Sequence, residues 1–144
     1  MKDRRKMVRQ FDINKVRQNL NAFNEIAFAY VFGSAKDGVI KEGSDIDIGI
    51  YVTKERNDLD LRLKILTALE NAVSGFDNFD LVILNNASSV LAMEAIKGKL
   101  LFVRDEWLDT YSGFYSLTCR QFEDDIFWMK KQLEYRGYEV QWDN

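Results

Sequence analysis

Two aspartates stand one residue apart at the start of an apolar segment, in the run Ser44-Asp45-Ile46-Asp47-Ile48-Gly49-Ile50. Successive side chains of an extended strand point to opposite faces, so Asp45 and Asp47 project to one side and the isoleucines to the other. Neighbouring carboxylates supply part of the ligand set of a hard divalent cation. Mg²⁺ suits this pair because it takes one or two carboxylates and fills its other positions with water and phosphate oxygens.

A Gly-Ser pair lies upstream, at the end of another apolar segment, in Val31-Phe32-Gly33-Ser34. Gly33 allows the backbone to approach a ligand closely, and a helix beginning at Ser34 would direct free N–H groups at a phosphate. An Asp-x-Asp alone is often only a solvated strand edge. The Gly-Ser pair, a polar loop of ten residues and the two aspartates together indicate a site for a metal ion and phosphate.

This pattern resembles the GS-x10-D-x-D signature of the nucleotidyltransferase superfamily that includes DNA polymerase beta, and most closely its minimal, single-domain (MNT) members. The motif covers Gly33 to Asp47, and a wider similarity extends from about Ala29 to Asp105. The resemblance implies an α+β, polymerase beta-like fold. We therefore expect a mixed sheet of about four strands with flanking helices and a long C-terminal helix.

A third carboxylate, Asp80, begins the apolar segment Leu81-Val82-Ile83-Leu84. A neighbouring strand would bring Asp80 beside Asp45 and Asp47, although Asp77 is a nearby rival. In nucleotidyl transfer an additional carboxylate holds a metal ion or takes the hydroxyl proton. By resemblance, Phe79-Asp80-Leu81-Val82 matches the family's third-aspartate strand.

The resemblance thus assigns both the catalytic and the nucleotide-binding roles to particular positions. Asp45, Asp47 and Asp80 are the predicted catalytic residues and the ligands of a pair of Mg²⁺ ions, and ATP is the predicted substrate. Gly33, Ser34 and Lys36 are the predicted nucleotide-binding residues.

One position departs from the family pattern. Many members carry Arg or Lys immediately before the glycine that follows Gly-Ser, whereas this chain has Asp37, with Lys36 one place earlier. A triphosphate would repel an acid, so either Asp37 turns outward or nucleotide affinity is weak. Lys36 and Lys41 are the nearest basic substitutes.

Length and composition limit the class of protein. The 144 residues suit a single domain, 1–144, and 47% hydrophobic with 30% charged residues is typical of a soluble protein. No apolar run approaches the ~18 residues of a membrane span, and the start of the chain is charged rather than signal-like. We expect a cytoplasmic protein with no membrane contact. A net charge of −3 gives no reason to expect direct binding of nucleic acid.

Missing residue types exclude several chemistries. The chain has no histidine, which excludes Ser-His-Asp and Cys-His catalysis and zinc sites that rely on imidazole. Acid–base chemistry is left to carboxylates, lysine or tyrosine. The single cysteine, Cys119, has no disulfide or metal-ligand companion, and we interpret it as a small buried hydrophobic residue.

Hydrophobic periodicity predicts elements that would position these groups. The expected strands are 25–32, 44–52, 79–84 and 99–103. The expected helices are 12–24, a helix capped by Asn57 or Asp58 that stops at Gly75, and a short helix that runs from the cap residues 85–89 to Ile96 and ends at Gly98. Lys2 to Arg9 is expected to be frayed or loosely docked.

The last third predicts one long helix that ends at Gly137. Its apolar positions recur at steps of three and four, which is more typical of core packing than of a cofactor site. These positions are Leu108, Tyr111, Tyr115, Thr118, Phe122, Ile126, Met129 and Leu133. Tyr135, Tyr138 and Trp142 follow where the helix ends, and they either anchor a partner or pack back on the domain.

The resemblance also suggests a biological role. MNT proteins are commonly the antitoxins of toxin–antitoxin pairs whose toxin is a helical HEPN-domain RNase. It implies transfer of AMP from ATP to a tyrosine of that toxin. Two alternatives stay open: a nucleotidyltransferase acting on a small molecule such as an antibiotic, and a non-catalytic antitoxin that neutralises its partner by binding. Homo-oligomerisation is also left open.

Overall fold

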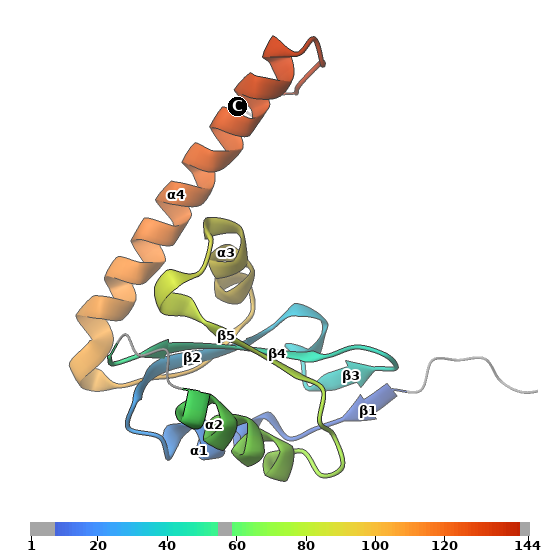
Figure 1. Cartoon of the computed structure of the whole chain (residues 1–144), viewed down its shortest axis with the longest axis vertical. Helices are drawn as coiled ribbons and strands as arrows, with labels where there is room; N and C mark the ends of the chain where they lie inside the picture. The colour runs from blue at the N-terminus through green and yellow to red at the C-terminus, as the bar shows by residue number, and fades with distance from the viewer. Residues whose placement is uncertain (1–7, 55–58, 142–144) are drawn as a thin grey trace, which may run out of the picture.

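A computed structural model describes residues 8–54 and 59–141. It has an α+β fold in which one mixed sheet carries helices on both faces (Figure 1). The strands are β1 (Val8–Gln10), β2 (Ile26–Phe32), β3 (Val39–Lys41), β4 (Ile46–Val52), β5 (Phe79–Ile83) and β6 (Lys99–Val103). The helices are α1 (Ile13–Asn21), α2 (Leu59–Ala72), α3 (Ser89–Lys97) and α4 (Leu108–Tyr135), with short 3-10 turns at Gly33–Ala35, Leu84–Asn86 and Asp105–Trp107.

The main sheet has the strand order β5-β4-β2-β6. The central strand β2 is antiparallel to both β4 and β6, and every one of its residues is buried. Strand β5 joins β4 in parallel after the crossover through α2. This confirms the expected α+β class and mixed four-stranded sheet. The sequence did not predict the small second sheet, in which β1 pairs antiparallel with β3.

The two faces of the sheet carry separate apolar layers. Ile46, Ile48 and Ile50 of β4 lie in the layer under α1 and α2, together with Ile65 and Leu69. Strand alternation therefore turns the odd-numbered side chains of β4 toward α3 and α4. The second layer confirms this, because it holds Tyr51 of β4 and Val82 of β5 against residues of α3 and α4.

The first half of helix α4 packs on the sheet. Tyr111 and Phe114 pack against Phe28, with ring centroids 5.1 and 5.4 Å away, and the hydroxyls of Tyr30 and Tyr111 are 3.2 Å apart. Further along, the hydroxyl of Ser89 donates a hydrogen bond to Asp125. Beyond that point α4 projects away from the body of the protein (Figure 1).

The prediction that the whole apolar stripe of this helix packs in the core is therefore wrong for its outer half. Thr118 is buried, but 51% of Met129 and 64% of Trp128 are exposed. The hydrophobic periodicity predicted the helix correctly, but it did not predict that the outer half of its apolar face would be exposed. An apolar face has the same spacing whether it meets its own domain or another molecule.

Other expectations differ only at their ends. Helix α1 begins at Ile13, because Asp12 is its N-cap and accepts a hydrogen bond from the Asn14 N–H at 2.9 Å. The predicted caps Asn57 and Asp58 lie outside the described residues, as do Trp142 and most of the basic stretch from Lys2. None of the helices in the described ranges is long and apolar enough to cross a lipid bilayer.

Candidate active site

Three adjacent chain segments bring the predicted catalytic residues together at one end of the sheet. Asp47 of β4 pairs with Phe32, the last residue of β2, and on its other side it pairs in register with Asp80 of β5. The Gly33 turn follows Phe32 directly, and Asp45 precedes β4 by one residue. The pairing of Asp47 with Asp80 means that the two carboxylates start from neighbouring backbone positions.

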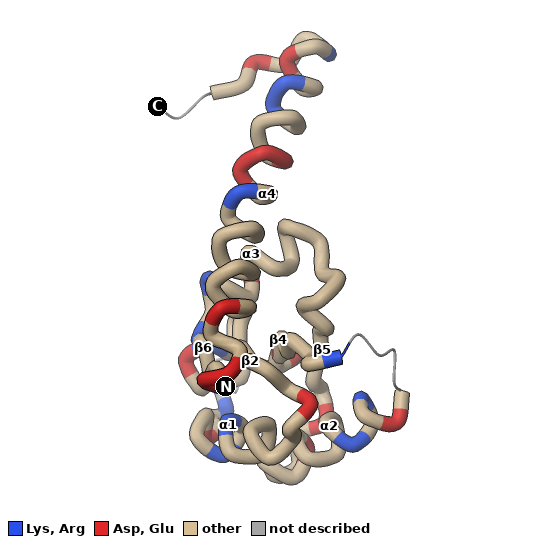
Figure 2. Tube along the Cα trace, turned by 90° about the vertical axis from the view of Figure 1, so that its left-hand side faces the viewer, with Lys and Arg blue, Asp and Glu red and all other residues tan. Residues whose placement is uncertain are grey.

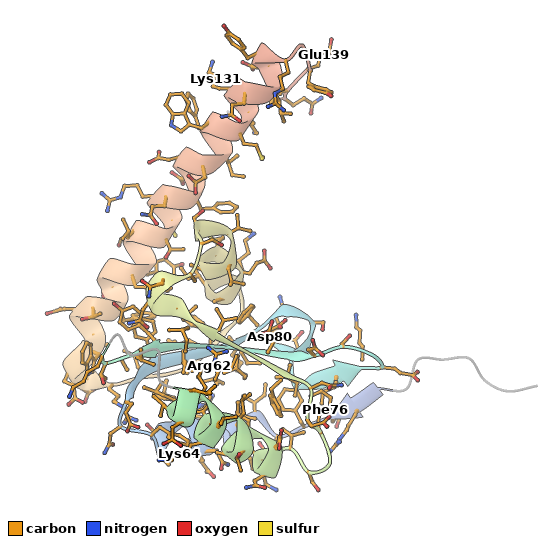
Figure 3. All side chains as sticks on the ribbon, viewed as in Figure 1. Arg62, Lys64, Phe76, Asp80, Lys131 and Glu139 are labelled. Carbon is orange, nitrogen blue, oxygen red and sulfur yellow. The ribbon has the colours of Figure 1, made fainter. Side chains whose placement is uncertain are left out.

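All three carboxylates leave the same face of the sheet. Asp45 and Asp47 share the side of β4 that carries Tyr51, and Asp80 shares the side of β5 that carries Val82. This is the face covered by α3 and α4. Asp45 and Asp80 are exposed and Asp47 is partly buried, so a solute can reach the group. Figure 3 shows Asp80 on the sheet, well away from Lys131 near the end of α4.

Gly33 lies against the Asp47 carboxylate. Its φ of +69° is in the left-handed region, and a Cβ built on it would overlap Asp47 Oδ2. Any side chain at position 33 would thus displace the carboxylate as well as strain the backbone. The glycine and the second aspartate of the motif are in direct contact, which their separation in the sequence does not reveal.

The charges of the group repel one another. The pKa of Asp47 is raised above its usual value, first by burial and then by the negative charges of Asp80 and Asp45. A cluster of carboxylates that raises the pKa of its innermost member is stabilised by an added cation, because the cation offsets the repulsion.

These residues fit a divalent cation through their chemistry. Within residues 8–54 and 59–141, no three acidic or cysteine side chains are already arranged around a single metal position. Mg²⁺ does not need such a cage, since one or two carboxylates together with water and substrate phosphates complete its coordination. Asp45 and Asp47, with Asp80 beside them, offer that smaller set.

The predicted nucleotide-binding residues form a tight turn rather than an α-helix. Gly33–Ala35 is one 3-10 turn that ends at Lys36, so the helix that would direct N–H groups at a phosphate is limited to this single turn. Ser34, Lys36 and Asp37 are exposed beside the carboxylates' end of the sheet.

Gly98 lies directly behind the strand end that precedes Gly33, a role that the sequence does not predict. It is the expected helix end, the C-cap of α3. In addition, a Cβ on Gly98 would lie 2.8 Å from the Cα of Phe32, the residue that pairs with Asp47. The close approach of two backbones fixes the strand end that precedes Gly33.

A separate cavity of about 350 Å³ lies at the opposite end of β4. It is lined by Asn24, Glu25, Val52, Thr53, Lys54, Asp60, Leu61 and Lys64. None of the predicted site residues is among them. The carboxylate cluster is accessible, since Asp45 and Asp80 are exposed, and its position is defined by the motif and the strand register.

Replacing Asp80 with asparagine is expected to lower turnover by about 10²- to 10⁴-fold, the usual contribution of a positioned acid or base. Nucleotide binding, measured by calorimetry, should change little, because Asp45 and Asp47 remain. Asp77→Asn is the matched control, since Asp77 lies in the loop before β5 and pairs with no strand. Loss of turnover in the Asp77 variant but not in the Asp80 variant would reassign the role.

Comparisons with known proteins agree with this geometry. The family model described as "Polymerase beta, Nucleotidyltransferase" matches residues 14–107. This range includes every predicted site residue. Among curated proteins, none matches the sequence.

Solved structures share the fold over most of the chain. A toxin–antitoxin structure with AMP-PNP has 23% identity and a TM-score of 0.64, and the match covers 87% of this chain and 94% of that one. A structure of a tri-AMPylated Shewanella oneidensis HEPN toxin in complex with MNT antitoxin has 22% identity and a TM-score of 0.58, covering 85% and 90%. A toxin–antitoxin MntA-HepT structure gives 22% identity, a TM-score of 0.58 and coverage of 85% and 91%.

Proposed function

Because the chain belongs to the polymerase beta nucleotidyltransferase family, we propose that it is a Mg²⁺-dependent enzyme that transfers AMP from ATP to a tyrosine hydroxyl of a HEPN-domain toxin. The modification silences the toxin, and the chain acts as its antitoxin. The observation that carries the proposal is the in-register pairing of Asp47 with Asp80 directly beside the Gly33 turn.

The reaction divides its tasks among the residues of this site. The acceptor hydroxyl oxygen forms a bond to the α-phosphorus of ATP, the bond from that phosphorus to the bridging oxygen breaks, and pyrophosphate leaves. The phenolic proton passes to Asp80. The backbone of the Gly33 turn and the side chains of Ser34 and Lys36 hold the phosphates. A divalent cation held by Asp45 and Asp47 would supply neutralisation of phosphate charge.

The openness of the site supports a large acceptor. Asp45 and Asp80 are exposed, so a tyrosine on the surface of another protein can reach them. Two similar structures also support a protein acceptor. One contains AMP-PNP, and the other contains an AMPylated HEPN toxin with its MNT antitoxin. A small-molecule acceptor would call for an enclosed pocket beside the carboxylates.

The exposed aromatic residues at the end of α4 support a protein partner. Tyr135 is 96% exposed and Tyr138 is 64% exposed, so neither packs back on the domain. Exposed tyrosines of this kind anchor many protein interfaces. Trp142, which was expected to join them, lies outside the described residues.

The experiment is to incubate the chain with its partner toxin, ATP and Mg²⁺ and to weigh the toxin by mass spectrometry. The toxin should gain one or more AMP units, and peptide mapping should place them on tyrosine. Asp45→Ala should abolish the gain, whereas Asp77→Ala should leave it intact. An unchanged toxin mass, with equal inhibition by the wild type and Asp45→Ala, would instead establish a binding antitoxin without catalysis.

A further inference from the structure

We propose that Arg62 of α2 is a positioning residue for AMP transfer, which acts through the backbone of β5 to keep Asp80 beside Asp47. The inference rests on the proposed function, because Arg62 matters to the reaction only if Asp80 takes part in it. Helix α2 covers the face of the sheet opposite to the three carboxylates. We therefore assign Arg62 no contact with the substrate.

Arg62 holds the peptide group that follows Asp80. Its Nη2 donates a hydrogen bond to the carbonyl oxygen of Leu81 at a distance of 3.1 Å. Leu81 directly follows Asp80 in β5, and its side chain is buried in the apolar layer under α1 and α2. Arg62 is partly buried, and Figure 3 shows it between α2 and the sheet. A charged donor makes a stronger hydrogen bond than a neutral one, so this contact restrains the strand next to Asp80.

The Leu81 carbonyl points away from β4. The Ile46 N–H of β4 donates to the carbonyl oxygen of Asn78 at 2.9 Å, so the backbone of Asn78 faces β4. Successive residues of a strand direct their backbone groups to alternate sides, so Asp80 also faces β4 and Leu81 faces the outer side of β5. There the described part of the chain adds no further strand to the main sheet. Arg62 supplies the hydrogen bond that a neighbouring strand would otherwise make.

The other end of β5 is held by a separate side chain. Asn85, just after β5, accepts a hydrogen bond from the Val52 N–H at 2.9 Å and donates one to the Val52 carbonyl oxygen at 3.0 Å. Its amide thus continues the pairing of β5 with β4 beyond the last backbone pair, Ile50 with Ile83. Loss of the Arg62 contact should therefore release the half of β5 that carries Asp80, while Asn85 retains the other half.

An equivalent contact on the opposite side of the sheet provides a matched control. Helix α2 lies under β5, and α1 lies under β6 (Figure 2). From α1, Arg17 donates a hydrogen bond from Nε to the carbonyl oxygen of Leu101 in β6 at 2.7 Å. Both contacts join an arginine of a covering helix to a backbone carbonyl of an end strand. The Arg62 contact adjoins a predicted catalytic residue in the sequence, whereas the Arg17 contact does not.

The first test compares the kinetics of AMP transfer to the toxin by the wild type, Arg62→Met and Arg17→Met. Methionine keeps an unbranched apolar side chain and removes the donor. Arg62→Met should lower kcat by up to about a hundredfold, the loss expected when a reacting group is displaced by about 1 Å. The KM for ATP should not change, because the predicted ligands of the metal ion and phosphates remain. Arg17→Met should lower the Tm by a similar amount and keep the wild-type kcat. Arg62→Lys retains a charged donor and should recover most of the rate.

The second test combines Arg62→Met with Asp80→Asn. If Arg62 acts through Asp80, the double variant should have the kcat of Asp80→Asn alone, because residues that act on one group have non-additive effects. A general loss of stability would instead multiply the two losses of rate. Multiplied losses, or an Arg17→Met variant as slow as Arg62→Met, would contradict a positioning role. So would an Arg62→Met chain that does not fold, because Arg62 would then serve the stability of the whole domain.

Nuclear magnetic resonance follows the position of β5 without any assay of activity. The amide signals of Asp80 and Val82, whose backbones face β4, should shift in Arg62→Met and return toward the wild-type positions in Arg62→Lys. They should stay in place in Arg17→Met. Unshifted signals or a full kcat in Arg62→Met would overturn the proposal. A wild type that transfers no AMP while these signals still respond would refute the proposed function alone and leave Arg62 as the residue that holds β5.

Discussion

Replacing Asp47 with asparagine is expected to reduce AMP transfer by at least about a hundredfold, since a metal ion contributes several kcal/mol of transition-state stabilisation through its ligands. Asp47 lies between Asp80 on β5 and Gly33 in the turn after β2, and its pKa is raised first by burial and then by the charges of Asp80 and Asp45. The measurement is the rate at which the toxin gains AMP at saturating ATP and Mg²⁺.

The same variant should be at least as stable as the wild type when no metal is present. Folding raises the pKa of Asp47 and so favours its protonated form. This favourable contribution is fully present below the pKa of the unfolded chain and is lost as the pH rises through the folded pKa. At neutral pH the ionised carboxylate opposes folding, and asparagine removes that charge.

Thermal unfolding separates the catalytic role of Asp47 from a structural one. Without metal, the Tm of Asp47→Asn should equal or exceed that of the wild type at pH 7, and the difference should shrink as the pH is lowered. Added Mg²⁺ should raise the Tm of the wild type more than that of the variant, because ligands of the native state stabilise it. A variant that is both less stable and fully active would refute the metal assignment.

Substituting valine for Gly33 is expected to abolish measurable AMP transfer. The new side chain would strain a backbone with φ of +69°, at a cost of about 1–3 kcal/mol, and would push into the Asp47 carboxylate. It would also fill the space where backbone N–H groups meet phosphate. Calorimetry should show loss of ATP binding, and the activity assay should show loss of transfer.

Gly43→Val provides the control for backbone strain. Gly43 has a similar φ of +76°, but a Cβ there meets nothing within 4 Å. This variant should lose a comparable amount of stability and keep both ATP binding and transfer. Equal loss of activity in the two variants would mean that strain, rather than proximity to Asp47, explains the effect at position 33.

Much of this arrangement could be predicted because local rules decide it. Apolar runs specified the four main strands, and alternation along β4 correctly placed Asp45 and Asp47 on one face. The preference for Asp80 over Asp77 agrees with the strand register. The family resemblance supplied the reason to look for a third carboxylate at all.

The remaining features depend on tertiary contacts that leave no local signal. The helical segment at Gly33–Ala35 is limited to one 3-10 turn, and β3 of the small sheet begins at Val39. Gly98 looked like an ordinary helix end, and only the fold places its backbone against Phe32. The free half of α4 had the periodicity of a core helix, because periodicity records an apolar face and not its neighbour.

The place of β5 in the sheet has a consequence for how firmly the site is held together. Among the strands that the structure describes, it is the edge strand of the main sheet, and it joins β4 through a long crossover. Edge strands open locally more readily than central ones, and crossover pairings form late because the intervening loop must close first. Local opening of β5 can therefore remove Asp80 from the carboxylate cluster while Asp45, Asp47 and the core stay folded. Amide hydrogen exchange along β5 measures how often this opening occurs.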